Sequence, residues 1–237
     1  MSRATRVLTL IHFVGNALLL WLAYYWLSVG ESTIGRLAWS AILAVLIAAA
    51  ALWLHGTGFT FFRTDRSALS APLLTALRNL LPLFLLAIAV VVVYGLLSWW
   101  RDYSAQPVFK IASYVTLKLR KPVKPGTVQT IFNGALWILR WVLLPVLLVP
   151  LTSHIANKGW RGFRPSIPRH WLYWLEVVVL LICGIWLPLK LITWVPKLSS
   201  FGMQMTSFVI RLLIGYLLFV TAWLLLELFT SRVKQLP

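Results

Sequence analysis

The chain has 237 residues, of which 60% are hydrophobic and only 11% are charged, and its mean hydropathy is +0.86. An ordinary soluble domain is about 25% charged, so this composition excludes a soluble protein and indicates an integral membrane protein. The 22 basic and five acidic residues give a net charge of +17. Because Cys183 is the one cysteine, an internal disulfide and a cysteine-ligated metal site are both excluded.

Six apolar runs predict six transmembrane helices, because each run is long enough to cross about 30 Å of hydrocarbon at about 1.5 Å per residue. The runs lack the alternating pattern of a transmembrane barrel. We therefore expect an all-α, multi-pass bundle that forms a single transmembrane domain over residues 1–237, placed in a bacterial inner (cytoplasmic) membrane. The spans are expected at about 7–28, 34–55, 79–100, 129–152, 171–195 and 205–229.

The first two runs are joined by a very short connection, which predicts a tight helical hairpin. Ser32 and Thr33 can cap the second helix there. The N-terminal run has a basic start like that of a signal peptide, but it is longer, ends in bulky aromatic residues and lacks a small-residue cleavage pattern. We therefore interpret this run as a first transmembrane span that is retained in the protein.

Two segments between the spans are amphipathic and predict one or two helices lying in the membrane interface. In residues 109–121, apolar side chains fall at helical spacing and the basic side chains take the other faces; residues 67–78 show the same pattern more weakly. Prolines within the spans are expected to kink their helices. These prolines are Pro82, Pro145, Pro150 and Pro188.

The basic residues predict contact with anionic lipid headgroups, since a lysine or arginine near such a surface contributes roughly 1 kcal/mol of attraction. Nucleic acid is excluded as a partner because the short loops offer no solvent-facing basic platform. The residues expected to bind headgroups are Lys118, Arg120, Lys121, Lys124, Lys158, Arg161, Arg164 and Arg169. The basic residues divide evenly between the two sides of a six-span arrangement, so they leave the orientation open.

Arg140 lies near the middle of the fourth expected span and Glu176 near the start of the fifth. Charged residues in lipid usually face the interior and pair, so we expect an intramembrane ion pair between these two side chains. A proton or substrate relay and separate snorkelling to the interface are the alternatives, and Glu227 is a competing acidic partner on the same side.

The four histidines all fall near one membrane face in a six-span arrangement. His12 and His55 belong to the two helices of the tight hairpin, where a facing pair could ligate haem b or shape a quinone site. Apart from haem b or a quinone bound by these two histidines, no cofactor is expected. No metal site is expected either, because Asp65 and Asp102 are far apart and clustered aspartates are absent.

The composition favours a non-catalytic membrane subunit or scaffold that packs in a larger membrane complex and binds anionic lipid through basic loops. Its partners would be anionic lipids and other membrane protein subunits, some of them acidic enough to balance its charge. The loops are too short to build a soluble catalytic site, so no enzymatic activity is expected. A small transporter or channel, and a haem- or quinone-binding anchor of a redox complex, are the alternative functions.

Overall fold

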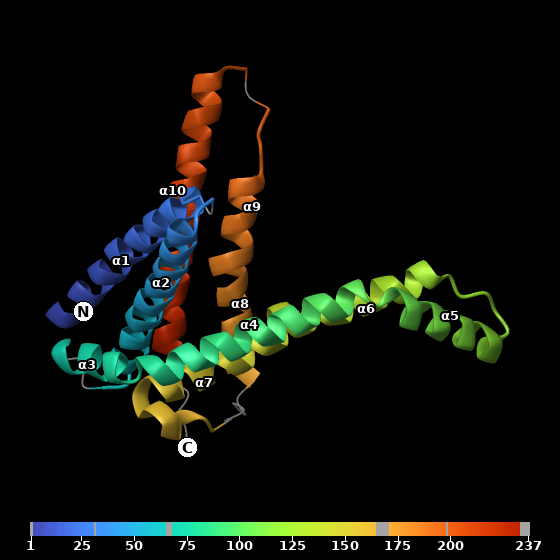
Figure 1. Cartoon of the computed structure of the whole chain (residues 1–237), viewed down its shortest axis with the longest axis horizontal. Coiled ribbons are helices and arrows are strands. Elements are labelled where there is room, and N and C mark those ends of the chain that lie inside the picture. The colour runs from blue at the N-terminus through green and yellow to red at the C-terminus, as the bar shows by residue number, and fades with distance from the viewer. Residues whose placement is uncertain (1, 31, 65–67, 165–170, 198, 233–237) are drawn as a thin grey trace. The chain divides into compact units, whose positions relative to one another are not determined.

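A computed structural model describes residues 2–30, 32–64, 68–164, 171–197 and 199–232. Over these residues the chain is entirely helical and has no strand (Figure 1). Six helices are long and apolar enough to cross a membrane. The predicted all-α fold with six spans is therefore confirmed, and the chain is a multi-pass membrane protein.

The helices of the first half of the chain are α1 (Arg3–Ser28), α2 (Ile34–Phe61), α3 (Ser70–Arg78), α4 (Leu80–Asp102), α5 (Ala105–Leu119) and α6 (Pro125–Ile138). Those of the second half are α7 (Leu144–Lys158), α8 (Trp171–Leu181), α9 (Leu187–Thr193) and α10 (Phe201–Arg232). Two π-helical segments, Leu139–Leu143 and Ile182–Trp186, and a 3-10 turn, Gly159–Gly162, continue or connect these helices. The continuous helical stretch Pro125–Gly162 forms the fourth span and Leu172–Thr193 the fifth.

The structure bears out the expected cap of α2, where the side-chain oxygen of Thr33 accepts from the backbone N–H of Arg36 at 3.3 Å. However, α2 continues to Phe61, six residues beyond the end of its predicted span at residue 55. Residues 56–61 contain glycine and threonine, which weaken both hydropathy and helix propensity. All six are buried, so packing against other helices stabilises this last part of α2.

Two of the prolines explain the two π-helical segments. Pro145 and Pro188 lie two residues after the ends of Leu139–Leu143 and Ile182–Trp186. A proline cannot donate to the carbonyl four residues earlier, and its ring clashes with that carbonyl. The residues four positions before these prolines, Trp141 and Gly184, lie at the centres of the two segments. Because proline removes the ordinary hydrogen bond at this point, each helix widens there by about one residue per turn.

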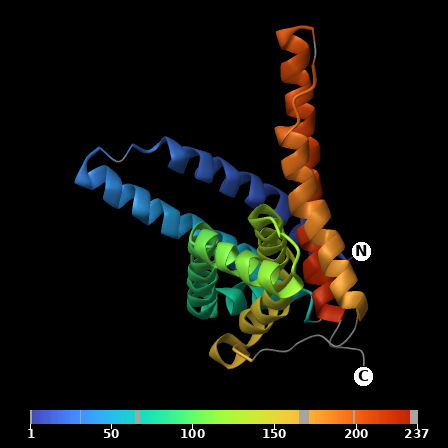
Figure 2. The ribbon, with the colours of Figure 1, turned by 90° about the vertical axis from the view of Figure 1, so that its right-hand side faces the viewer.

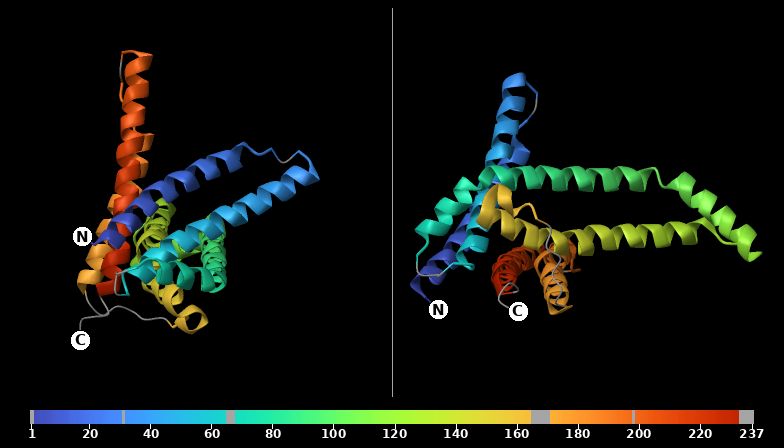
Figure 3. Two further views of the ribbon diagram at one scale, coloured as in Figure 1. Left: turned by 90° about the vertical axis from the view of Figure 1, so that its left-hand side faces the viewer. Right: turned by 90° about the horizontal axis from the view of Figure 1, so that it is seen from below.

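The chain forms two compact units, and the larger one comprises residues 1–84 and 149–237. In this unit α1 and α2 form the predicted hairpin, drawn in blue in Figure 3. The helices α9 and α10 run side by side as a second pair, and α10 also contacts α1 and α2 (Figure 2). Because α10 touches both helices of the hairpin, residues from the two ends of the sequence meet inside one unit.

The second unit comprises residues 85–148. Within it α5 packs against α6 and buries Val108 and Ala112, while Phe109 and Tyr114 remain exposed. The amphipathic segments expected at 67–78 and 109–121 both form short helices separate from the six spans, α3 and α5. The single transmembrane domain expected over residues 1–237 stays a prediction.

Candidate functional site

Three side chains from three spans meet in the larger unit: His12 of α1, His55 of α2 and Glu227 of α10, called here the His–His–Glu cluster. Nδ1 of His55 lies 3.2 Å from Oε1 of Glu227, within hydrogen-bond distance. Nε2 of His12 lies 3.6 Å from Oε2 of the same carboxyl group. The two imidazole rings meet edge to face with centroids 5.5 Å apart. The carboxyl group of Glu227 thus contacts both histidines.

The cluster is deeply buried. The side chains of His12 and Glu227 are 0% exposed, and that of His55 is 18% exposed. Both ring nitrogens of His12 and Oε2 of Glu227 lack a hydrogen-bond partner among the described residues. A buried polar atom without a partner costs about 1–3 kcal/mol. Three such atoms lie together here, so the cluster is not a fully satisfied hydrogen-bond network among the described residues.

Glycines make room for this arrangement. A Cβ added at Gly58 of α2 would overlap the carboxyl group of Glu227, and one added at Gly15 of α1 would lie 3.0 Å from the side chain of Leu54. Each glycine follows a histidine of the cluster by three residues and therefore lies on the same helix face. Small residues let membrane helices approach closely, so the His-x-x-Gly pattern at residues 12–15 and 55–58 positions both histidines at helix crossings.

Apolar and aromatic residues enclose the cluster. Leu8, one turn before His12, packs against Phe61 and Phe62 in a buried hydrophobic core. On the other side, the Tyr216 hydroxyl of α10 donates to the backbone carbonyl of Phe13 and ties α10 to α1. These contacts hold α1 against α2 and α10 next to the buried His12.

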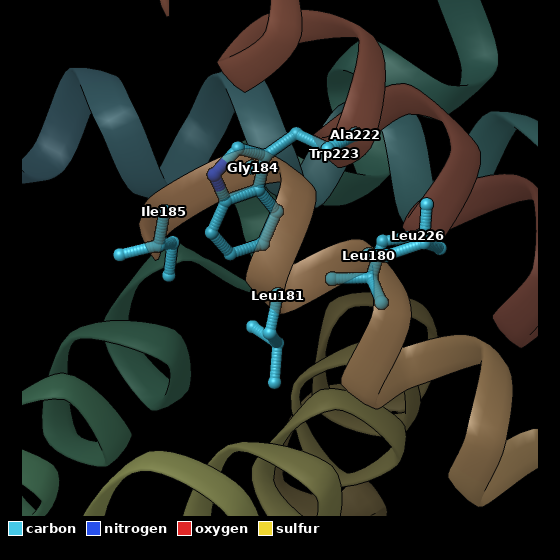
Figure 4. Close-up of a pocket in the computed structure, with 7 residues that line it drawn as sticks. All are labelled: Leu180, Leu181, Gly184, Ile185, Ala222, Trp223 and Leu226. Atoms are coloured by element: carbon cyan, nitrogen blue, oxygen red, sulfur yellow. The ribbon is translucent and has the colours of Figure 1, made fainter. Parts of the chain in front are cut away.

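Trp223, one turn before Glu227, covers His55 with ring centroids 5.0 Å apart. The same tryptophan lines a small apolar pocket between α10 and the π-helical segment Ile182–Trp186 (Figure 4). Gly184 at the centre of that segment faces Ala222, and a Cβ at position 184 would lie 2.6 Å from the Ala222 Cβ. Trp223 therefore lies between the partly exposed histidine and the widened turn of the neighbouring span.

The structure places Arg140 and Glu176 in different units. In residues 85–148, Nη2 of Arg140 donates to the Ser98 hydroxyl at 2.8 Å, and the Tyr94 hydroxyl donates to the Arg140 carbonyl at 2.5 Å. Glu176 is half-buried in α8 of the larger unit. The ion pair between Arg140 and Glu176 stays a prediction.

The role of Arg211 was missed by the sequence analysis. Its guanidinium group, on α10, donates to backbone carbonyls at the end of α9, including Leu191 at 3.0 Å and Trp194. It therefore caps carbonyls at the end of α9 that have no partner within that helix.

Arg63, just beyond α2, is half-buried, and burial lowers the pKa of its guanidinium group.

The basic residues expected to bind lipid headgroups are exposed wherever the structure describes them. Those near the end of α5 are Lys118, Arg120, Lys121 and Lys124. Those near the end of α7 are Lys158, Arg161 and Arg164, whereas Arg169 lies outside the described residues. Exposure leaves their charges free to contact a headgroup, and headgroup binding stays a prediction.

No protein-family model, curated protein or solved structure matches the chain. Its class is therefore defined by the fold and the site: an all-helical, multi-pass membrane protein with a buried His–His–Glu cluster. One ligand atom from each of the three residues lies within 4.8 Å of the other two, so the cluster can hold a small cation. Haem or quinone binding by His12 and His55 stays a prediction, and the Glu227 carboxyl group in contact with both rings suits a single ion better than a porphyrin.

Proposed function

We propose that the chain is a small membrane transporter or channel that moves a cation past the His–His–Glu cluster. The observation that carries this proposal is the contact of Glu227 with His12 and His55 across three spanning helices. Ionisable residues inside a membrane are costly, and they usually mark substrate or ion pathways. From the sequence alone, a transporter or channel was an alternative to a non-catalytic membrane subunit.

The helix interruption beside the cluster supports the same proposal. The π-helical segment Ile182–Trp186 packs against α10, on which Trp223 and Glu227 lie. Short π-helical segments are frequent at functional sites, and discontinuous spans often form the binding sites of transporters. A wider turn here gives α10 a neighbour that can change its packing while the His12 side of the cluster stays closed.

The test is cation flux into liposomes that contain the purified protein. Charge movement is recorded on a solid-supported membrane for a panel of monovalent and divalent cations and for a proton gradient. We expect a current for at least one cation, lost in the Glu227→Gln variant and kept in Asp102→Asn, which removes an exposed carboxylate outside the cluster. Currents that are equal in the unmodified protein and in Glu227→Gln would contradict the proposal.

The second candidate is a non-catalytic subunit of a larger membrane complex that holds anionic lipid. It is favoured by the exposed basic residues after α5 and by the exposed apolar side chains of α4, such as Val91 and Leu96, which need lipid or protein neighbours. Helical spans fit a bacterial inner membrane, since outer membranes use barrels. Native mass measurement after gentle solubilisation tests this candidate: co-purifying subunits support it, and a fully active 27.0 kDa monomer or homo-oligomer contradicts it.

A further inference from the structure

We infer that the His–His–Glu cluster binds one divalent first-row transition-metal ion, for which Zn²⁺ is the natural probe, with His12, His55 and Glu227 each supplying one ligand. This names the cation of the proposed transporter and in that sense rests on the proposed function. It also departs from the sequence-based expectation of no metal site, which was based on the scattered acidic residues and the single cysteine.

The spacing of the ligand atoms fits tetrahedral coordination. Zinc lies about 2.0–2.2 Å from histidine nitrogen and carboxylate oxygen, so neighbouring ligand atoms in a tetrahedron are about 3.3–3.6 Å apart. Nδ1 of His55 lies 3.2 Å from Oε1 of Glu227, Nε2 of His12 lies 3.6 Å from Oε2, and one ligand atom from each of the three residues lies within 4.8 Å of the other two. One ion can therefore contact all three side chains once the Glu227 carboxyl group and the two rings shift toward a common centre.

The unpartnered atoms give an independent reason for a cation. Nε2 of His12 and Oε2 of Glu227 are fully buried and lie just beyond hydrogen-bond distance from each other. A cation between them would satisfy both atoms at once. The absence of a side chain at Gly58 makes room for the Glu227 carboxyl group beside the histidines, because any larger residue there would overlap it.

The chemical types of the three ligands select the class of cation. Ca²⁺ takes six to eight oxygen ligands and Mg²⁺ an octahedron of oxygens, neither of which one carboxylate and two imidazoles provide. Imidazole nitrogen suits zinc, iron, copper and nickel, and Cu(I) prefers sulfur ligands, whereas the one cysteine, Cys183, lies outside the cluster. The ligand set therefore favours a divalent first-row metal of the zinc type.

Three protein ligands leave one coordination position open. Structural zinc sites are usually closed by four protein ligands, whereas open sites keep a position for water or another exchanging ligand. His55 is the partly exposed member of the cluster, and Trp223 lies against it. The ion would thus reach the cluster and leave it on the His55 side, past Trp223, which suits a transported ion better than a permanent structural one.

The test is metal binding by the purified protein, carrying an affinity tag without histidine, in mild detergent. Equilibrium dialysis with mass-spectrometric metal analysis should give one Zn²⁺ per chain. Because even the loss of a residue that only positions a ligand weakens metal affinity about 10–100-fold, we expect at least about a tenfold loss in His12→Gln, His55→Gln and Glu227→Gln. The Asp102→Asn variant, which changes charge equally to Glu227→Gln, should bind like the unmodified protein.

A gain of signal separates ligation from a structural role. In a Cys183→Ser background, His55→Cys should still bind Co²⁺ and add a thiolate-to-cobalt charge-transfer band, which a misfolded or merely packed site cannot produce. Absence of bound metal in the unmodified protein, or equal affinity in the three ligand variants, would overturn the metal site. Zn²⁺ binding without any cation flux would support the metal site and contradict the transport function. Flux of another cation without Zn²⁺ binding would support the transport function and contradict the metal site.

Discussion

Gly58 of α2 lies directly against the Glu227 carboxyl group of α10, so closely that any Cβ at position 58 would overlap it. Glycine weakens a helix interior by about 0.5–1 kcal/mol relative to alanine. A glycine in the buried last part of α2 therefore has a packing reason, which is the approach of an acidic side chain to two histidines. This relationship links the sequence of α2 to the His–His–Glu cluster and leads to the first prediction.

Replacing Gly58 with alanine should destabilise the protein by about 1–3 kcal/mol, the usual cost of overpacking a core. It should also weaken any cation binding, because Glu227 must move. The matched control is Gly35→Ala in the same helix, where nothing lies within 4 Å of the added Cβ. Denaturant unfolding in detergent measures both variants, and a stability of Gly58→Ala equal to that of Gly35→Ala would show that the close approach is wrong.

Removal of the Arg211 guanidinium group should release the end of α9. Arg211→Gln loses charged hydrogen bonds to the carbonyls of Leu191 and Trp194, and hydrogen bonds to charged groups contribute about 1.5–3 kcal/mol each. Thermal unfolding should show a loss of at least about 1.5 kcal/mol. The control is Lys190→Gln, which removes an exposed charge near the end of α9. It should change stability by less than about 0.5 kcal/mol. Equal effects of the two substitutions would contradict the capping role.

The ion pair between Arg140 and Glu176 is tested by a double-mutant cycle. Each single change, Arg140→Met or Glu176→Leu, should destabilise by leaving the other charge without its partner. The double variant should recover part of the loss, with a coupling energy of at least about 0.5 kcal/mol. Strict additivity would show that the hydrogen bond from Arg140 to Ser98 is sufficient for this arginine and that Glu176 acts alone.

Neutralising the basic residues after α5 should reduce the retention of anionic lipid. Native mass spectrometry compares the unmodified protein with a variant in which Lys118, Arg120, Lys121 and Lys124 become glutamine. A variant with Lys118, Lys121 and Lys124 replaced by arginine keeps the charge and should retain lipid normally. If the unmodified protein holds zwitterionic and anionic lipids equally, headgroup binding by these residues is wrong.

The spans could be predicted from the sequence because hydropathy and helix length are local properties. Thr33 as a cap, and the irregular helices before Pro145 and Pro188, also follow from residues close in the chain. The nearness of His12 and His55 follows from the short connection of one hairpin. Such features need no knowledge of how distant spans pack.

Glu227 could not be assigned to the cluster in the same way. It lies 172 residues after His55, and its place depends on how α10 crosses the hairpin, which no local pattern decides. The signal that was available is the glycine three residues after each histidine, at positions 15 and 58. Arg211 was missed for a similar reason, because its role depends on where α9 ends beside α10.

The metal site makes a last prediction about thermal stability. A ligand that binds the folded state alone stabilises it by RT ln(1 + [L]/Kd), about 2.7 kcal/mol at one hundred times Kd. Zn²⁺ should therefore raise the melting temperature of the unmodified protein, increasingly with its concentration, and a chelator should reverse the rise. Asp102→Asn should show the same rise, whereas Glu227→Gln should show little, because it removes the negatively charged ligand between His12 and His55. Equal rises in the two variants would mean that Zn²⁺ binds elsewhere on the chain.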